Sequence, residues 1–527
     1  MHPAGARPVD ASAGQFELRG YLHQLASVGL LSVHDGPCDL ADVAATLDGN
    51  ERAVLFSKVG PEQAALAGNV AGSRERLALA FGTDVAGLLP TVLERLRRTP
   101  GTREVAAGEA PVQEVVLRGS DADLTNLPVH LQHGLDGAPY ISSSMDIVLD
   151  PRTGMTNVGI RRLMLRGRRE AGIDLVAPSD LKAIYEYHVS LSKPLPIAFV
   201  IGSHPVDHVA ATMRIPVDEV GLIASLRNEA LPVVKCVTSE LRVPADAEYI
   251  IEGYLDPAGH VEAEGPYGEF LGYYGGVKMN PVFHLTAVTH RRDPIFQTST
   301  IAGRHLGLTD SAQLIALRTE VSIWRALETA VRELRGVYAT TSSGGMFNVR
   351  ISMRQRVPGE ARNAIAAAFG SLANIKHVFV FDPDIDIFSE QQVDWALATR
   401  FQADRDLVVQ AGMRTLPLDP SLAGARTGAK AGFDCTMPVE VADTLESQVP
   451  KAPDYAGERF GSLTAALQDG PKTFEQLMAA TGSRDGREIV RALDDLRAAR
   501  RLGRTGDGKW MLRDPEGDRG ERRRDDA

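Results

Sequence analysis

Apolar residues recur at helical spacing between residues 16 and 31 and predict an amphipathic helix near the start of the chain. A short apolar run at 53–56 is typical of a strand. Ser73 stands before a stretch rich in alanine and leucine, where a serine side chain can cap the first turn of a helix. We therefore expect an α/β domain over residues 15–110.

The pattern changes between residues 111 and 308 to short β-type runs separated by glycine, proline, aspartate and asparagine. Many short strands with turn residues between them are typical of a β-barrel or a sandwich. One amphipathic helix, at 179–192, interrupts them, and its first turn would offer free backbone N–H groups to an anion. The runs that we interpret as strands are 112–117, 140–149, 195–201, 233–237, 247–253 and 282–290.

Helices and strands alternate again over residues 309–445, which predicts a second α/β domain. A long amphipathic helix is expected at 312–335, a buried strand at 378–381 and a further helix beginning at 393. The fold class is therefore α/β (α+β), with a barrel or sandwich in its central part.

Residues 458–513 have the pattern of a separate small module with three short helices followed by a glycine-centred hairpin. That order matches a winged helix-turn-helix, in which Arg484, Arg487 and Arg491 would lie on the helix that reads DNA. Acidic residues share this helix, so its basic stripe is not clean. We favour a role in packing or assembly over one in DNA binding.

Composition narrows the class of protein. The 527 residues carry a formal net charge of −11 and are 44% hydrophobic, which argues against a protein built mainly to bind nucleic acid or an anionic membrane. The three cysteines stand far apart, without the spacing of a metal or redox motif. No uninterrupted apolar run of membrane-spanning length and no signal peptide is recognisable. We expect a cytoplasmic protein.

The stretch from Glu264 to Glu269, Glu-Gly-Pro-Tyr-Gly-Glu, is the strongest candidate for chemistry. Its glycines and proline predict a tight turn that can direct both carboxylates into one cavity. A carboxylic acid in an apolar pocket has a raised pKa and can donate a proton near neutral pH. Phe270, Tyr273 and Tyr274 follow and either form a wall of such a pocket or pack in the core. A solvated loop with two incidental acids is the alternative.

A second candidate is Asn157-Val-Gly-Ile-Arg-Arg162, at the end of a strand-like run. Strand alternation places Ile160 and Arg162 on one face, and Asn157, Gly159 and Arg161 on the other, unless a bulge intervenes. An arginine can hold a substrate carboxylate through two parallel hydrogen bonds. Taken alone, the pair could equally be surface arginines.

Several motifs occur together in an order that resembles the UbiD-type decarboxylases. They are Asp136-Gly-Ala-Pro-Tyr-Ile, Asp150-Pro, Asn157-Val-Gly-Ile-Arg-Arg, Val233-Val-Lys-Cys, Glu264-Gly-Pro-Tyr-Gly-Glu, Lys376-His-Val-Phe-Val-Phe-Asp-Pro-Asp-Ile-Asp and Trp395-Ala-Leu-Ala-Thr-Arg. The resemblance covers about residues 15 to 440. It implies an N-terminal α/β domain, a split β-barrel cofactor domain at 111–308 and a C-terminal α/β domain that mediates dimerisation, with the 458–513 module as an addition.

The resemblance also implies a cofactor, prenylated FMN, held through its phosphate by a divalent metal, Mn²⁺ or Mg²⁺, and by K⁺. The implied metal ligands are Asn157, Glu219 and, where the family usually has a histidine, Asp180. An oxygen donor suits Mn²⁺ or Mg²⁺, although the change leaves the metal's identity open. The implied cofactor contacts are Asn157, Val158, Gly159, Ile160, Arg161, Arg162, Ser179, Asp180, Glu219 and Lys376.

The catalytic trio implied by the resemblance is Arg162, Glu264 and Glu269. Arg162 would hold the carboxylate to be lost, Glu264 would orient Arg162, and Glu269 would protonate the product carbon. The expected reaction is a reversible, non-oxidative decarboxylation of an aromatic, heteroaromatic or α,β-unsaturated carboxylic acid. The expected partners are that acid, a flavin prenyltransferase that supplies the cofactor, and further copies of the chain in a homodimer or larger homo-oligomer.

Two other functions stay open from the sequence. A flavin oxidoreductase could use the same barrel, but no Gly-x-Gly-x-x-Gly follows a predicted strand to mark a nicotinamide site. A DNA-binding regulator could act through residues 458–513, but it would leave most of the chain without a role.

Overall fold

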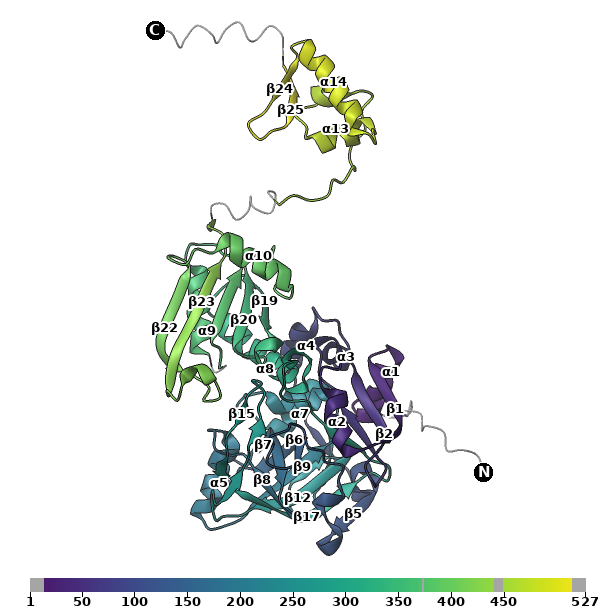
Figure 1. Cartoon of the computed structure of the whole chain (residues 1–527), viewed down its shortest axis with the longest axis vertical. Coiled ribbons are helices and arrows are strands. Elements are labelled where there is room, and N and C mark those ends of the chain that lie inside the picture. Colours follow the sequence, from purple (N-terminus) through teal and green to yellow (C-terminus); the bar gives the residue numbers. More distant parts are fainter. Residues whose placement is uncertain (1–13, 372–373, 440–448, 514–527) are drawn as a thin grey trace, which may run out of the picture. The chain divides into compact units, whose positions relative to one another are not determined.

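The computed structural model describes residues 14–371, 374–439 and 449–513. By its internal contacts the chain divides into two compact units, residues 1–442 and 443–527 (Figure 1). Each unit is described by itself below. Among the described residues, no helix combines the length and the hydropathy needed to cross a bilayer.

The N-terminal layer is a four-stranded sheet with helices, as expected from the sequence. Its strand order is β1-β2-β3-β18, and β18 comes from a segment more than two hundred residues further along the chain. The Ser73 side chain accepts a hydrogen bond from the Arg76 N–H at 3.1 Å and caps α3. The first helix ends at Ser27, because Leu31 already begins β1. The bounds are α1 Leu18–Ser27, β1 Leu31–Cys38, α2 Leu40–Leu47, β2 Ala53–Val59, β3 Ala64–Gly68, α3 Arg74–Ala80, α4 Leu88–Arg95 and β18 Ile295–Thr298.

The central part of the chain contains a closed six-stranded barrel. Its order is β12-β9-β6-β7-β8-β17, and a further pairing of β12 with β17 closes the ring. Large apolar side chains fill the interior, where the rings of Phe199 and Phe283 meet edge to face at 5.2 Å. The strands are β6 Tyr140–Leu149, β7 Thr156–Leu165, β8 Glu170–Ile173, β9 Leu195–Ile201, β12 Tyr249–Leu255 and β17 Val282–His290. The barrel strands that the hydrophobic runs predicted are thereby confirmed.

The pairing between β7 and β8 is short, so one edge of β7 is left unpaired along the segment that contains the candidate residues. Only Leu163, Met164 and Leu165 of β7 pair with β8. The preceding half of β7, which contains Asn157–Arg162, pairs with β6 alone. Its other edge therefore has free backbone groups for α7 and for a ligand.

Three helices lie beside the barrel: α5 Asp180–Ser190, α6 Pro205–Thr212 and α7 Glu219–Arg227. The buried Arg227 ties two of them together: its Nε donates to Asp207 of α6 at 2.7 Å, and its Nη1 donates to Asp246 at 2.5 Å. A buried charge with two carboxylate partners fixes one geometry, since removing either partner would leave an uncompensated charge. Arg227 is the last residue of α7; at the other end of that helix Asp218 accepts the Thr156 N–H at 2.8 Å and so holds Glu219 against β7.

The C-terminal part of the first unit is a five-stranded sheet, β19-β20-β21-β23-β22, with helices α8, α9 and α10. The helix predicted at 312–335 is too long, because α8 ends at Leu327 and Arg335 already lies in β19, which pairs with β20. The acidic turn after β21 binds Arg400, whose Nη1 donates to Asp382 at 3.1 Å and to Asp384 at 2.9 Å. The bounds are α8 Asp310–Leu327, β19 Leu334–Ala339, β20 Asn348–Met353, α9 Glu360–Gly370, β21 His377–Phe381, α10 Glu390–Arg400, β22 Leu407–Arg414 and β23 Thr427–Cys435.

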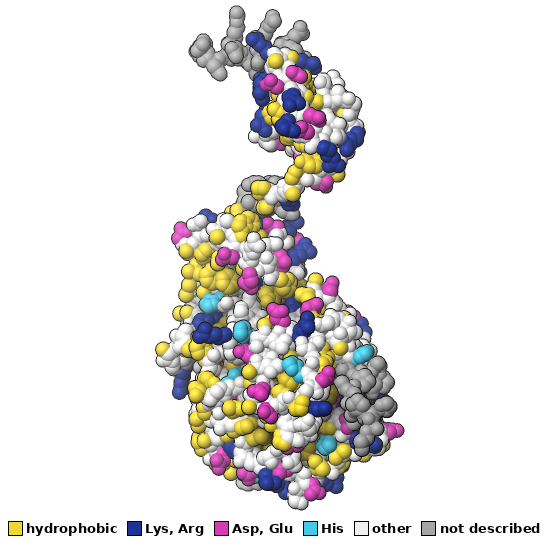
Figure 2. Space-filling view, turned by 45° about the vertical axis from the view of Figure 1, so that its right-hand side comes forward, with side chains coloured by type: hydrophobic (Ala, Val, Ile, Leu, Met, Phe, Trp, Pro, Cys, Tyr) yellow, Lys and Arg dark blue, Asp and Glu magenta, His cyan; other side chains and the backbone are white. Residues whose placement is uncertain are grey.

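The second unit contains α12 Leu463–Gln468, α13 Phe474–Thr481, α14 Gly486–Ala498 and the hairpin β24 Leu502–Arg504 and β25 Trp510–Leu512. The order of three helices and a hairpin is the predicted one. Leu467, Leu477 and Leu493 contribute to its own small apolar core. Basic and acidic side chains are interspersed on the face of this unit that Figure 2 shows.

Candidate active site

Arg162 of β7 lies at the centre of a group of carboxylates. Its Nε donates to Glu264 Oε1 at 3.0 Å, its Nη1 to Glu269 Oε1 at 3.1 Å, and its Nη2 to Asp174 Oδ2 at 3.0 Å. Its side chain is only 13% exposed. Burial opposes its charge, but the neighbouring Glu269 and Glu264 raise the pKa of Arg162, so the guanidinium is a permanent cation. The guanidinium also stacks over the Tyr267 ring, 4.6 Å from its centroid.

The local structure of β7 explains why the adjacent residues Arg161 and Arg162 have different surroundings. The pairing of β6 with β7 shifts between Ile141 and Ser144, a β-bulge opposite Arg162. Arg161 projects to the side of Gly159: a Cβ added to that glycine would lie 2.9 Å from Arg161 Nη1 and 3.0 Å from Asp146 Oδ1. Any larger residue at position 159 would therefore displace the Arg161 and Asp146 side chains.

The Glu264–Glu269 turn is fixed by the Asp136-Gly-Ala-Pro-Tyr motif. Asp136 Oδ1 accepts the Gly268 N–H at 2.9 Å, and the Gly137 N–H donates to the Pro266 carbonyl at 2.8 Å. Gly265 has a φ of +98°, which favours glycine. Position 137 also requires glycine, since a Cβ there would lie 2.4 Å from the Gly265 carbonyl oxygen. Two motifs that are far apart in the sequence thus form one rigid turn.

The two glutamates of the turn have different surroundings. Glu264 is fully buried and accepts hydrogen bonds from Arg162 and, at 3.3 Å, from Asn280 Nδ2. Glu269 is bonded to Arg162 through one oxygen, and burial raises its pKa although Arg162 opposes the shift. Glu269 is therefore a carboxyl that can carry a proton.

Asp174 and Lys278 belong to the same group and were not among the candidates expected from the sequence. Asp174 accepts from Arg162 and, at 3.1 Å, from Lys278 Nζ. Burial opposes its ionisation, but the charges of Arg162 and Lys278 lower the pKa of Asp174. Two cations here face three carboxyls, so a neutral Glu269 would balance the charge of the group. Neither residue lies in a recognisable motif; β8 and β16 (Lys278–Asn280) bring them to Arg162.

Tyr273 and Tyr274 are 61% and 44% exposed, so the expectation that they pack in the core is wrong. The Tyr274 hydroxyl accepts the Leu135 N–H at 3.0 Å. Tyr140 and Tyr267 are the aromatic residues that line the buried side of Arg162.

Two of the three predicted metal ligands, Asn157 and Glu219, meet at the open edge of β7, and the charge of Asp180 is near enough to affect Glu219. Glu219, the first residue of α7, accepts hydrogen bonds from Asn157 Nδ2 at 2.7 Å and from the Val158 N–H at 2.5 Å. Burial raises the pKa of Glu219 to about 7, and the nearby charges of Asp180 and Asp146 add to the shift. Both oxygens of Asp146 are buried without a hydrogen-bond partner. Arg161 lies near Asp146 but forms no hydrogen bond with it, and such a concentration of oxygen donors suits a divalent cation.

No group of three or more His, Cys, Asp or Glu side chains in the described part of the chain is arranged to hold a metal. The predicted set, which has two carboxylates and an amide, is not of that type. Ser179 caps α5 by accepting the Lys182 N–H at 3.2 Å, and Asp180 follows as the first helical residue, exposed to solvent. The side chain of Asp180 is therefore available to a ligand.

Comparison with protein-family models matches three consecutive domains of one enzyme family. They are the N-terminal, the Rift-related and the C-terminal domains of 3-octaprenyl-4-hydroxybenzoate carboxy-lyase, matched by residues 22–96, 103–305 and 312–435. The chain belongs to the UbiD family. Members of this family are carboxy-lyases, and the chain is a UbiD-like decarboxylase.

Relatives and solved structures agree with this assignment. Anhydromevalonate phosphate decarboxylase of Methanosarcina mazei is 32% identical over 73% of this chain and 87% of that protein. The UbiD-class enzyme HmfF from Pelotomaculum thermopropionicum in complex with FMN is 34% identical, with a TM-score of 0.77 over 83% of this chain and 97% of that one. An evolved dimeric form of HmfF in complex with prFMN is 32% identical, with a TM-score of 0.73 over 80% and 95%. Apo 3,4-dihydroxybenzoic acid decarboxylase (AroY) from Klebsiella pneumoniae is 28% identical, with a TM-score of 0.75 over 84% and 98%.

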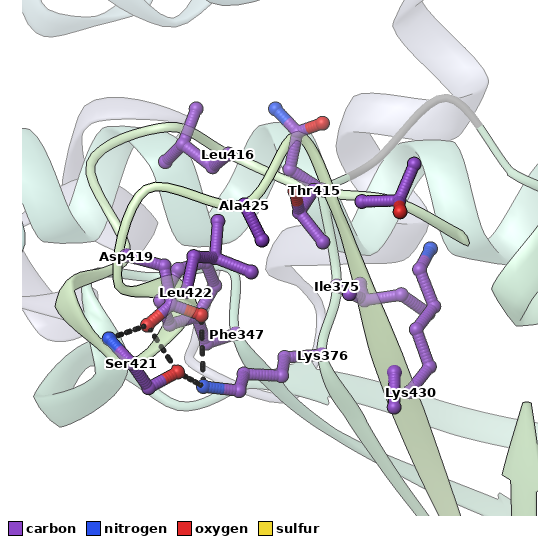
Figure 3. Close-up of a pocket in the computed structure, with 14 residues that line it drawn as sticks. Phe347, Ile375, Lys376, Thr415, Leu416, Asp419, Ser421, Leu422, Ala425 and Lys430 are labelled. Atoms are coloured by element: carbon purple, nitrogen blue, oxygen red, sulfur yellow. Dashed lines mark hydrogen bonds and ion pairs between the residues drawn. The ribbon is translucent and has the colours of Figure 1, made fainter. Parts of the chain in front are cut away.

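Among the UbiD cofactor contacts expected from the sequence, Lys376 lies apart from β7. It precedes β21 and lines a cavity of about 370 Å³ in the C-terminal sheet domain (Figure 3). Its Nζ pairs with Asp419 at 2.8 Å and contacts Ser421 Oγ at 2.7 Å (Figure 3). The structure thus brings Asn157, Val158 and Glu219 into contact, and it places Lys376 among residues of the C-terminal domain.

Proposed function

We propose that this chain catalyses the reversible, non-oxidative decarboxylation of an aromatic, heteroaromatic or α,β-unsaturated carboxylic acid with prenylated FMN. The observation that carries the proposal is the direct hydrogen bonding of Arg162 to both glutamates of the turn, with burial raising the pKa of Glu269. A carboxylate-binding cation beside a protonated carboxyl is the pair that decarboxylation followed by protonation requires.

Each residue of the group has a definite role in this proposal. Arg162 binds the substrate carboxylate through its planar guanidinium and so positions the C–C bond that breaks when CO₂ leaves. Glu264 orients Arg162 through Nε and is itself held by Asn280. Glu269 delivers a proton to the carbon from which CO₂ has left. When bound, prenylated FMN would accept the electron pair that the loss of CO₂ leaves behind.

The cofactor would be held at the open edge of β7. Asn157, Asp180 and Glu219 would bind Mn²⁺ or Mg²⁺, supported by the oxygen donors concentrated there. The backbone and side chains of Asn157–Arg162, together with Ser179 and Lys376, are the further cofactor contacts that we propose, and K⁺ is the proposed monovalent ion. The metal would bridge these oxygens to the flavin phosphate.

We propose a broad substrate class because the names of the relatives state different substrates. One is named for a phosphorylated acid and another for an aromatic one. Tyr140 of β6 and Tyr267 of the turn pack beside Arg162 and make its surroundings aromatic, which supports an aromatic or other unsaturated acid as the substrate.

We also propose the division of labour among the parts of the chain. Residues 15–110 form the N-terminal α/β domain, 111–308 the cofactor domain and 309–445 the oligomerisation domain of a cytoplasmic homodimer or larger homo-oligomer. Residues 458–513 form a winged-helix-like module that acts in packing or assembly. A flavin prenyltransferase would supply the cofactor.

The test is to co-express the chain with a flavin prenyltransferase and to measure CO₂ release from a panel of aryl, heteroaryl and unsaturated acids. Protein expressed without the prenyltransferase is the matched control. We expect at least one acid to lose CO₂ only with the loaded protein. Flavin reduction by NAD(P)H, with no CO₂ released from any acid, would instead identify an oxidoreductase and refute the proposal.

A further inference from the structure

The Tyr267 ring forms the face against which the Arg162 guanidinium packs. The guanidinium carbon lies 4.6 Å from the centroid of the ring, and Tyr267 is 2% exposed. The three carboxyls bonded to Arg162 hold its N–H groups, whereas the ring limits the tilt of the guanidinium plane. A carboxylate forms two parallel hydrogen bonds with an arginine only when it lies in that plane. The position of Tyr267 therefore decides where a substrate carboxylate can bind.

The Tyr267 hydroxyl is bonded to Gln132, which lies in the loop before Asp136. It donates to Gln132 Oε1 at 2.7 Å. Gln132 Nε2 in turn donates to Ser142 Oγ at 2.7 Å and to the Ser299 carbonyl at 3.0 Å. Both ends of the Gln132 amide are therefore used, and they connect the catalytic turn to β6 and to the residue that follows β18.

The direction of the hydrogen bond from Tyr267 follows from the chemistry of its neighbours. A carbonyl oxygen can only accept, so the nitrogen of the Gln132 amide must face Ser299 and the oxygen must face Tyr267. The Tyr267 hydroxyl is thus the donor, and burial raises its pKa well above that of a free phenol. A phenol that donates its proton gains electron density in its ring, which strengthens its attraction for a cation.

Gln132 is itself held by a buried part of the fold. Ser142 is 4% exposed and lies where the pairing of β6 with β7 shifts. Its hydroxyl accepts the Ser299 N–H at 3.0 Å and lies 3.1 Å from Thr298 Oγ1. The Gln132 amide is thereby tied to β6 and to the end of β18, and these strands do not belong to the turn. A side chain anchored in this way can hold the Tyr267 ring in one place.

We propose that Gln132 is a positioning residue of the decarboxylation. It acts on Arg162 through the Tyr267 ring and so sets the plane in which the substrate carboxylate binds. The inference deepens the proposed function and rests on it for the identity of that carboxylate.

The experiment is a double-mutant cycle on the full-length protein loaded with prenylated FMN. Gln132→Met removes the amide and keeps the length of the side chain, and Tyr267→Phe removes the hydroxyl and keeps the ring. The substrate is the acid of the panel that releases CO₂ fastest. We expect each single variant to raise KM and to lower kcat, with a loss of kcat/KM of about 5- to 20-fold, the effect of one lost buried hydrogen bond. The double variant should lose no more than Gln132→Met alone, because the glutamine acts through the hydroxyl.

A merely structural role of Gln132 would give a different pattern. Loss of folded or flavin-loaded protein lowers the apparent kcat and leaves KM unchanged. The double variant leaves neither a phenol nor an amide oxygen unpaired, so its Tm should return toward that of the wild type while KM stays raised. Gln113→Met is the matched control, since Gln113 is a buried glutamine whose Nε2 donates at 2.8 Å to the carbonyl of Lys235 in β10 (Leu231–Lys235).

Backbone hydrogen exchange gives a readout that does not depend on turnover. Peptides that cover residues 264–272 should exchange about 3- to 10-fold faster in Gln132→Met and at the wild-type rate in Gln113→Met. Failure of the proposed function is therefore distinguishable. The wild type would then release no CO₂ from any acid, while the exchange of the turn would still report whether Gln132 holds Tyr267.

Three outcomes would overturn the role of Gln132. The first is a Gln132→Met protein with the wild-type KM and full flavin loading. The second is unchanged exchange of the turn in that variant. The third is a double variant whose loss is the product of the two single losses, since Gln132 and the hydroxyl would then act separately. If Gln132→Met does not fold by circular dichroism, Tyr267→Phe repeats the kinetic and exchange measurements with the same expected results.

Discussion

Arg162 Nη1 donates to Glu269 Oε1 at 3.1 Å, so the cation proposed to bind the substrate is in direct contact with the proposed proton donor. Arg162 also holds Glu264 and Asp174, and these bonds use the remaining nitrogens of the guanidinium. Four of its five N–H groups are thereby used, so a substrate carboxylate can form two parallel hydrogen bonds only if one of the three partners leaves. Glu269 is the partner that can leave, because its burial favours the neutral form that an incoming carboxylate would tolerate.

Glu269→Gln should lower turnover by about a hundred- to ten-thousand-fold, since glutamine keeps the shape but has no acidic proton. Substrate binding should be retained, because Arg162 is unchanged. The measurements are single-turnover kinetics and deuterium incorporation from solvent. Turnover near the wild-type rate with full cofactor loading would mean that another residue supplies the proton.

Arg162→Lys should fail in a different way. A lysine is a point charge and cannot replace a planar fork that contacts three carboxyls and the substrate. We expect weaker substrate binding and loss of positioning, seen as a higher KM together with a lower kcat. A KM equal to that of the wild type would contradict the assigned role.

Asp174 and Lys278 should shift the pH profile in opposite directions. Glu269 must be protonated to act, so activity falls as pH rises through its pKa. Burial raises that pKa most, Asp174 adds to the shift, and Arg162 and Lys278 oppose it, while Glu264 acts in the same sense as Asp174. Asp174→Asn should therefore move the alkaline limb to lower pH and Lys278→Met to higher pH, each by roughly half a unit to one unit. If the alkaline limbs of the two variants moved in the same direction, this electrostatic role would be excluded.

Glu219→Ala should remove both metal and flavin. Glu219 is the residue that joins Asn157 and the β7 backbone, and it supplies a carboxylate to the proposed metal. Metal content by mass spectrometry and flavin content by absorbance are the two readouts. Glu229→Ala, an exposed glutamate just beyond the same helix, is the control. A Glu219→Ala protein that keeps prenylated FMN and metal would refute the ligand assignment.

Deleting residues 458–527 should change the assembly state or the stability and leave the decarboxylation detectable. The mixed charge of the second unit motivates this expectation: Arg487 is paired with Asp485, and Arg497 with Asp494. Size-exclusion chromatography, thermal unfolding and CO₂ release are the measurements. Nanomolar, sequence-selective DNA binding by the isolated segment would instead support a regulator.

Several local features could be predicted because they depend on neighbouring residues in the chain. The hydrophobic runs give β6, β9 and β17 with their observed ends. The cap at Ser73 was predictable for the same reason, since its hydrogen bond spans only three residues. The end of α8 was not, because pairing of β19 with a distant strand competes with a helical pattern that continues past Leu327.

The sequence by itself determined four of the six barrel strands, β6, β9, β12 and β17, the turn with its two glutamates and the arginine on β7, since periodicity, turn residues and motif order are local properties. Only the tertiary structure decided which charges meet. Asp174 and Lys278 come to Arg162 through β8 and β16. Such contacts depend on how strands and helices pack, and the contact of Lys278 with Asp174 joins residues 104 positions apart. The strength of a charge pair depends on its burial, which no single segment of the chain specifies.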